Sequence, residues 1–150
     1  MTNFSPLPHQ SAVLDSSDMV VLMETGMGGG KTETLIHWLA PQDLIQDPRF
    51  RSLAVVPCEQ ARVYFLERAL TSYLARGAEL YTRLGEIAFP SGARVAVAPI
   101  DRLHEYSVYS FHRVGVDNAH QIDKEAIRSS ILLARAGIHP QVLITSNLVH

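Results

Sequence analysis

A run of glycines that ends in a lysine and a threonine carries the clearest chemistry in this sequence. Gly28, Gly29 and Gly30 are followed directly by Lys31 and Thr32. Because glycine has no Cβ, such a backbone can approach phosphate oxygens closely and point its N–H groups at them. The lysine can then reach the β- and γ-phosphates, and the threonine hydroxyl can coordinate Mg²⁺. The segment therefore predicts a site for a nucleoside triphosphate.

The spacing of this segment and a distant aspartate support the same interpretation. Residues Thr25 to Thr32 fit the Walker A spacing, except that Thr25 stands where glycine or alanine is usual. Asp117 ends an apolar strand candidate, where a Walker B aspartate would hold Mg²⁺ through water. A glycine-rich turn that binds nothing is the alternative for the loop, and a simple turn or cap residue is the alternative for Asp117. The two features together favour phosphate binding.

Strands and helices that alternate along the chain must position these residues. Apolar runs predict strands at residues 19–23, 52–57, 113–117 and 141–146. Helical periodicity predicts helices at residues 31–40, 59–76 and 123–136. Residues 86–89 and 94–98, joined by a Pro-Ser-Gly turn, predict a hairpin. Strands that alternate with helices imply a mostly parallel sheet covered on both faces, and hence an α/β fold.

Length and composition limit the classes of protein that this chain can represent. The 150 residues suit one domain, which we expect to span residues 1–150, and 47% of them are hydrophobic, enough for a real core. The single cysteine excludes an internal disulfide and a multi-cysteine zinc site, and the net charge of −2 argues against a strongly basic nucleic-acid-binding module. With no membrane-spanning apolar run and no basic start typical of a signal peptide, we expect a soluble protein of the cytoplasm.

Several motifs, taken in order, resemble the ATPase domain of phage terminase large subunits, the motors that package DNA. The tripeptide Pro8-His9-Gln10 is similar to an adenine-recognising glutamine motif, and Val55-Val56-Pro57 to a strand segment shared with superfamily 2 helicases. Residues 86–95 resemble the terminase strand pair that precedes Walker B. Residues 116–120 stand where the Walker B Asp-Glu-Ala belongs, and residues 143–147 resemble the terminase coupling motif.

The resemblance implies a P-loop NTPase of the additional-strand type, with ATP and Mg²⁺ bound and ATP hydrolysis driving DNA translocation. It implies that Gln10 reads adenine and that Thr145, Ser146 and Asn147 sense the γ-phosphate. The final strand should lie between the Walker A and Walker B strands, because the coupling motif must reach the phosphates. The partners that it implies are double-stranded DNA, a portal, a capsid or a small terminase subunit, and further copies in a ring. A viral protein of this kind would act in the host cytoplasm.

The chain also departs from the terminase pattern. The catalytic glutamate expected after Asp117 is Asn118, which cannot act as a base toward water. Glu24 and Glu125 are conceivable substitutes, although neither stands at that strand end. With no arginine in the Walker A loop and no room for a nuclease domain, we expect a truncated fragment, a reduced relative or a hydrolysis-impaired regulatory protein that binds ATP. The first lobe of a superfamily 2 helicase remains a further alternative.

Overall fold

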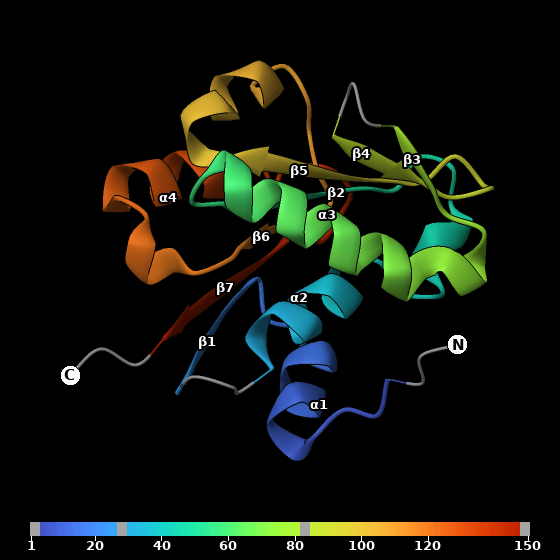
Figure 1. The fold of residues 1–150 in the computed structure, drawn as a ribbon, viewed down its shortest axis with the longest axis horizontal. Coiled ribbons are helices and arrows are strands. Elements are labelled where there is room, and N and C mark those ends of the chain that lie inside the picture. Colours follow the sequence, from blue (N-terminus) through green and yellow to red (C-terminus); the bar gives the residue numbers. More distant parts are fainter. Residues whose placement is uncertain (1–3, 27–29, 82–84, 148–150) are drawn as a thin grey trace.

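A seven-stranded β-sheet runs through the described part of the chain (Figure 1). The computed structural model describes residues 4–26, 30–81 and 85–147. The strands are β1 (Val20–Thr25), β2 (Arg51–Val56), β3 (Glu79–Tyr81), β4 (Glu86–Ala88), β5 (Arg94–Pro99), β6 (Arg113–Val116) and β7 (Gln141–Asn147). Their order across the sheet is β1-β7-β6-β2-β5-β4-β3. The pairings β1–β7, β7–β6, β6–β2 and β2–β5 are parallel. Strand β4 pairs antiparallel with both β5 and β3. The predicted mostly parallel sheet and the predicted hairpin are confirmed.

Helices cover both faces of this sheet. The α-helices are α1 (Pro8–Leu14), α2 (Lys31–Leu39), α3 (Glu59–Tyr73) and α4 (Lys124–Ile131). The 3₁₀ turns are η1 (Leu44–Gln46), η2 (Leu74–Arg76), η3 (Ile100–Tyr106) and η4 (Ala119–Gln121). Figure 1 shows α2 and α3 across one face of the sheet, with α1 beside α2. Successive residues of a strand point to opposite faces, so Ala54 and Val56 join the core under α2 and α3. Leu53 and Val55 join the core under η3 and α4.

The position of β7 brings the predicted site residues to one edge of the sheet. As predicted, β7 lies between β1, which leads into the glycine loop, and β6, which leads into Asp117. These three strands are parallel, so their carboxyl ends lie at the same edge, where open α/β sheets bind their ligands. The additional-strand order is therefore confirmed.

A glycine in β6 allows α2 to lie close to the sheet. A Cβ at Gly115 would lie only 2.2 Å from Cδ1 of Leu35, a fully buried residue of α2. Because Gly115 has no side chain, Leu35 of α2 packs directly against β6, the strand that ends beside Asp117. Because Lys31 and Thr32 are in the first turn of α2, this approach also positions their side chains.

Three details of the predicted elements are wrong. Within residues 59–76 the helical spacing predicts that Val63 and Leu74 lie in the core, but both are exposed, whereas Phe65, also predicted to lie in the core, is buried. The helix predicted to reach residue 136 ends at Ile131, because the chain then pairs with Phe111 through a parallel bridge and leaves the helical path. The apolar run at residues 19–23 predicts a buried strand, but it is only partly buried, because β1 is an edge strand of the sheet.

No helix among the described residues combines the length and the apolar character needed to cross a lipid bilayer.

Candidate phosphate and magnesium site

The glycine loop ends in a backbone conformation that glycine adopts most readily. Gly30 has φ +72° and lies just before the first residue of α2. Its carbonyl oxygen accepts hydrogen bonds from the backbone N–H and the side-chain hydroxyl of Thr34, at 2.9 and 2.8 Å. Gly28 and Gly29, the other two glycines predicted to contact phosphate, lie outside the described residues. The described end of the loop thus turns sharply into the helix, as a Walker A loop must.

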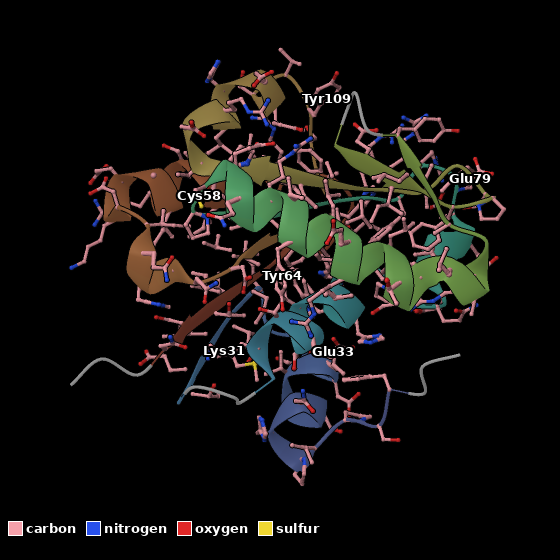
Figure 2. The ribbon with its side chains drawn as sticks, in the orientation of Figure 1. Lys31, Glu33, Cys58, Tyr64, Glu79 and Tyr109 are labelled. Carbon is pink, nitrogen blue, oxygen red and sulfur yellow. The ribbon has the colours of Figure 1, made fainter. Side chains whose placement is uncertain are left out.

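Lys31 begins α2 and lies almost completely buried beside β1 (Figure 2). Its ammonium Nζ donates to Thr25 Oγ1 at 3.2 Å and to the carbonyl oxygen of Gly26 at 3.3 Å. No carboxylate among the described residues lies within ion-pair distance of this ammonium. The lysine charge therefore remains available to an anion at the loop. The contact with Thr25 uses the residue at which the sequence departs from the usual motif.

Asp117 is the centre of a cluster of hydroxyl groups. Its carboxylate is 4% exposed and accepts a hydrogen bond from Thr145 Oγ1 at 2.8 Å. Thr32 Oγ1 lies 3.3 and 3.4 Å from the two carboxylate oxygens. Burial raises the pKa of Asp117 above its ordinary value, and the hydrogen bonds from Thr145 and Thr32 and the nearby charge of Lys31 oppose this shift. The structure thus joins Thr32, Asp117 and Thr145, which are far apart in the sequence.

The oxygens of Thr32 and Asp117 suit a magnesium ion. Mg²⁺ prefers hard oxygen ligands and is usually held by one or two protein groups together with water and substrate phosphates. A buried carboxylate is costly without a cation nearby, and the raised pKa of Asp117 reflects that cost. Among the described residues no group of three or more His, Cys, Asp and Glu side chains could hold a metal. The carboxylate of Asp117 and the hydroxyl of Thr32 fit an ion that takes its remaining ligands from water or phosphate.

Asn118 follows Asp117 in a left-handed conformation, with φ 53° and ψ 50°. It is the only non-glycine residue with positive φ among the described residues. Asparagine tolerates this region better than most residues do. Its backbone N–H donates to Thr145 Oγ1 at 3.2 Å. Asn118 thus occupies the position after Asp117, in a turn whose geometry suits asparagine better than glutamate.

The two conceivable substitutes for a catalytic glutamate are solvent-exposed. Glu125 forms an ion pair with Arg128 of α4 at 2.6 Å, and both side chains are more than 70% exposed. Glu24 is an exposed residue of β1. Neither contacts Asp117 in the hydrogen bonds and ion pairs of the described residues.

Gln10, which the resemblance assigns to adenine, fastens α1 to the glycine loop. The residue is 5% exposed. Its side-chain Oε1 accepts from the backbone N–H of Leu7 at 2.8 Å, and its Nε2 donates to the carbonyl oxygen of Gly30 at 3.2 Å. The structure therefore places Gln10 beside the loop, with both amide atoms engaged within the chain. Recognition of adenine stays a prediction.

The end of β7 is connected to the turn after Asp117 through a histidine. The backbone N–H of Asn147 donates to His120 Nδ1 at 3.1 Å, and the side-chain amide of Asn147 lies 3.3 Å from His120 Nε2. Ser146 Oγ donates to the carbonyl oxygen of Asn147 at 3.2 Å. Sequence reasoning treated His120 as an ordinary histidine, and only its place directly after the Asp-Asn-Ala segment could have marked it.

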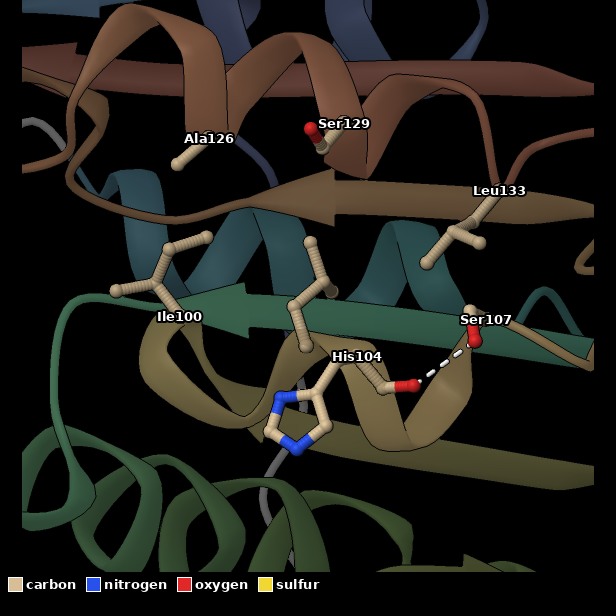
Figure 3. Close-up of a pocket in the computed structure, with 7 residues that line it drawn as sticks. Ile100, His104, Ser107, Ala126, Ser129 and Leu133 are labelled. Atoms are coloured by element: carbon tan, nitrogen blue, oxygen red, sulfur yellow. Dashed lines mark hydrogen bonds between the residues drawn. The ribbon is translucent and has the colours of Figure 1, made fainter.

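A hollow of about 350 Å³ between η3 and α4 is separate from this site (Figure 3). Its walls are mostly apolar, with Ile100, Ala126 and Leu133 among them, and its titratable side chain is His104. None of the predicted site residues lines it.

The comparisons with known proteins address the fold. No protein-family model and no curated protein matches the chain. The large terminase ATPase domain of Thermus phage P74-26 superimposes with a TM-score of 0.71 and 17% sequence identity over 95% of this chain. The large terminase of bacteriophage HK97 superimposes with a TM-score of 0.77 and 10% identity, also over 95% of this chain. The large terminase of another thermophilic bacteriophage, in complex with ADP, gives a TM-score of 0.66 and 13% identity over 93% of this chain.

This chain spans 65% of the Thermus phage domain, 33% of the HK97 terminase and 38% of the ADP-bound terminase. At such low identity the agreement concerns the fold, which is the feature that the motifs predicted. The chain therefore has the P-loop fold of the ATPase domain of phage large terminases.

Proposed function

We propose that this chain binds ATP with Mg²⁺ as the ATPase domain of a terminase-like motor, in which hydrolysis drives the movement of double-stranded DNA. The observation that carries the proposal is the buried Asp117 carboxylate between the hydroxyls of Thr32 and Thr145, beside the ammonium of Lys31. A carboxylate, a hydroxyl and a cation at the carboxyl ends of parallel strands form the arrangement that a metal-bound phosphate chain requires. The terminase fold supports the same conclusion.

Each residue then has a defined role toward the nucleotide. Lys31 exchanges its hydrogen bonds to Thr25 and Gly26 for the β- and γ-phosphate oxygens. Thr32 and Asp117 hold Mg²⁺, which when bound offsets the negative charge of the phosphates.

Three other groups complete the proposed site. The Walker A spacing assigns phosphate contacts to Gly28, Gly29 and Gly30, and the resemblance assigns adenine to Gln10. Thr145 orients Asp117, and with Ser146 and Asn147 it senses the γ-phosphate.

Asn118 makes this a slow ATPase. Its side-chain carbonyl can accept a hydrogen bond from the attacking water, but it cannot take the proton. The absence of general-base assistance lowers the rate by about 10²–10⁴-fold. A regulatory protein that binds ATP and barely hydrolyses it is the second candidate, and the same residue favours it.

The proposed partners are double-stranded DNA, a portal, a capsid or a small terminase subunit, and further copies in a ring. The net charge of −2 makes a single copy a poor DNA-binding surface. Binding of DNA would therefore require an assembly in which several copies of the chain contact the DNA together.

The test is calorimetric titration with ATP in the presence and absence of Mg²⁺, followed by hydrolysis assays with and without linear double-stranded DNA. We expect Mg²⁺-dependent binding, and Lys31→Ala should lose a charge-assisted contact of roughly 1.5–3 kcal/mol. Equal ATP affinity in the wild-type chain and in Lys31→Ala would contradict the assignment of the loop. Turnover that DNA stimulates supports the motor, whereas binding without turnover favours the regulatory protein.

A further inference from the structure

A second cavity, of about 470 Å³, lies at the far end of α2 from the glycine loop. Lys31 begins this helix and Leu39 ends it, so the cavity and the loop are at opposite ends of one element. Its apolar wall includes Phe4, Pro6 and Leu14 from the N-terminal segment. The cavity is also lined by Trp38, Arg76 and Arg113, so it combines aromatic, aliphatic and cationic groups.

Two arginine side chains are held in this cavity by the end of α2. Arg113 Nη1 donates to the carbonyl oxygen of Trp38 at 2.6 Å, and its guanidinium lies 4.9 Å from the centre of the Trp38 ring. Arg76 Nη1 donates to the carbonyl oxygen of Ala40 at 2.5 Å and lies over the Tyr73 ring at 5.2 Å. Because the two carbonyls are only two residues apart, they bring both guanidiniums to the same wall. Each guanidinium keeps further N–H donors that these contacts do not use.

The positive charges of Arg76 and Arg113 are not paired with carboxylates among the described residues. No described carboxylate lies within 4.0 Å of either guanidinium, although most other described arginines have such a partner. Burial lowers the pKa of Arg76 and lowers that of Arg113 to about 10, so both remain cations at neutral pH. The exposed Asp43 lines the cavity and opposes the shift of Arg113, and the carbonyl end of α2 adds a partial negative charge.

The remaining titratable group at this wall is His37. It pairs with Glu33 at 3.1 Å and stacks on Phe4, and burial is the main cause that lowers its pKa. At neutral pH it therefore adds little positive charge. Two half-buried cations thus face one exposed carboxylate and a helix end, which leaves the cavity attractive to an anion.

We propose that this cavity binds a small organic phosphate, with its phosphate on Arg76 and Arg113 and its organic part on the apolar wall. A phosphate carries several oxygens and up to two negative charges, which match two guanidiniums. Inorganic phosphate would fill only a small part of the 470 Å³, so an attached apolar group is needed to cover Phe4, Pro6 and Leu14. This site is independent of the nucleotide site.

Trp38 is the only tryptophan of the chain, so its fluorescence reports on this cavity. We expect a saturable fluorescence change on titration with phenyl phosphate, and at least tenfold weaker binding in Arg76→Gln, which leaves the contact between Trp38 and Arg113 in place. Arg128→Gln, which removes an exposed arginine of α4, is the matched control and should bind as the wild type does. Lys31→Ala should also bind phenyl phosphate within twofold of the wild type, although its affinity for ATP is reduced.

A response that is absent, that persists unchanged in Arg76→Gln, or that disappears in Lys31→Ala would overturn the proposal. Circular dichroism checks the fold of each variant. If Arg76→Gln does not fold, Phe4→Ala tests the other wall: it should weaken phenyl phosphate several-fold and leave inorganic phosphate unchanged. Equal effects on both probes would contradict the assignment of the apolar wall. Because Lys31→Ala separates the two sites, failure here leaves the proposed ATPase function untouched.

Discussion

Replacing Thr145 with valine removes the hydroxyl that holds Asp117 and keeps the shape of the side chain. Thr145 is fully buried, and its Oγ1 donates to Asp117 Oδ1 at 2.8 Å while it accepts from the Asn118 N–H at 3.2 Å. Valine can do neither. Since no cavity is created, the change in the free energy of unfolding measures the lost hydrogen bonds alone.

The size of the effect follows from these two contacts. A hydrogen bond to a charged group contributes about 1.5–3 kcal/mol, and a half-buried N–H left without a partner adds up to ~1 kcal/mol. We therefore expect Thr145→Val to lower the free energy of unfolding by about 2–4 kcal/mol, which for a domain of this size lowers Tm by roughly 5–15 °C.

The loss should depend on pH in a definite direction. Burial raises the pKa of Asp117 above its ordinary value of 3.8, so stability is lost as the pH rises from 3.8 through that raised pKa and the buried carboxylate becomes charged. Thr145 opposes this shift, and the valine variant raises the pKa of Asp117 further. The penalty of Thr145→Val is therefore greatest at neutral pH and shrinks as the pH falls through the pKa of Asp117.

Urea denaturation without Mg²⁺, at a series of pH values from neutral down to the ordinary pKa of 3.8, measures both effects. Thr145→Ser keeps the hydroxyl and removes one methyl group, which should cost about 1 kcal/mol. If serine and valine destabilise the chain equally at neutral pH, the hydroxyl does not support Asp117. A valine penalty that stays constant over the whole pH series would also refute the reasoning.

Asn118→Glu should speed single-turnover ATP hydrolysis by about 10²–10⁴-fold. Because glutamate is strained at φ 53°, the variant should also lose ~1 kcal/mol of stability. Unchanged rates at unchanged ATP affinity would contradict the role given to Asn118. Thr25→Val removes a partner of the Lys31 ammonium in the free protein, so calorimetry should show ATP affinity within about threefold of wild type, since that contact is given up on binding. Gly115→Ala forces Leu35 to move, and thermal melts should show a loss of about 1–3 kcal/mol; an unaltered Tm would mean that α2 adjusts freely.

The architecture could be predicted because its signals are local. The apolar runs, the Lys-Thr pair after three glycines, and the hairpin turn each follow from a few adjacent residues. The order of β1, β7 and β6 was inferred from what the coupling segment must reach, and the structure confirms it.

The internal contacts of the site could not be predicted in this way. Helix periodicity alone does not fix how α3 lies on the sheet, so the exposure of Val63 and Leu74, which have core spacing, could not be predicted. Two hydrogen bonds depend on distances between elements and have no local sequence signal. They are the bond from Gln10 of α1 to Gly30 and the bond from Lys31 to Thr25. The left-handed turn at Asn118 has a sequence signal, because asparagine tolerates that conformation better than most residues. The resemblance to terminases identifies Asn118 only as the residue that replaces a catalytic glutamate.

The place of β1 at the edge of the sheet has a consequence for local unfolding. Among the described strands β1 pairs only with β7, and Val20 and Leu22 are about half exposed, so freeing this strand breaks one ladder and little core. Amide hydrogens of β1 should therefore exchange with solvent faster than those of β2 or β6, which have neighbours on both sides. Since β1 leads into the glycine loop, a ligand that the loop holds only in the closed form should slow exchange in β1 by a factor of 1 + L/Kd, where L is the free ligand concentration. An edge strand of the sheet thus carries the loop, and its amides report occupancy directly.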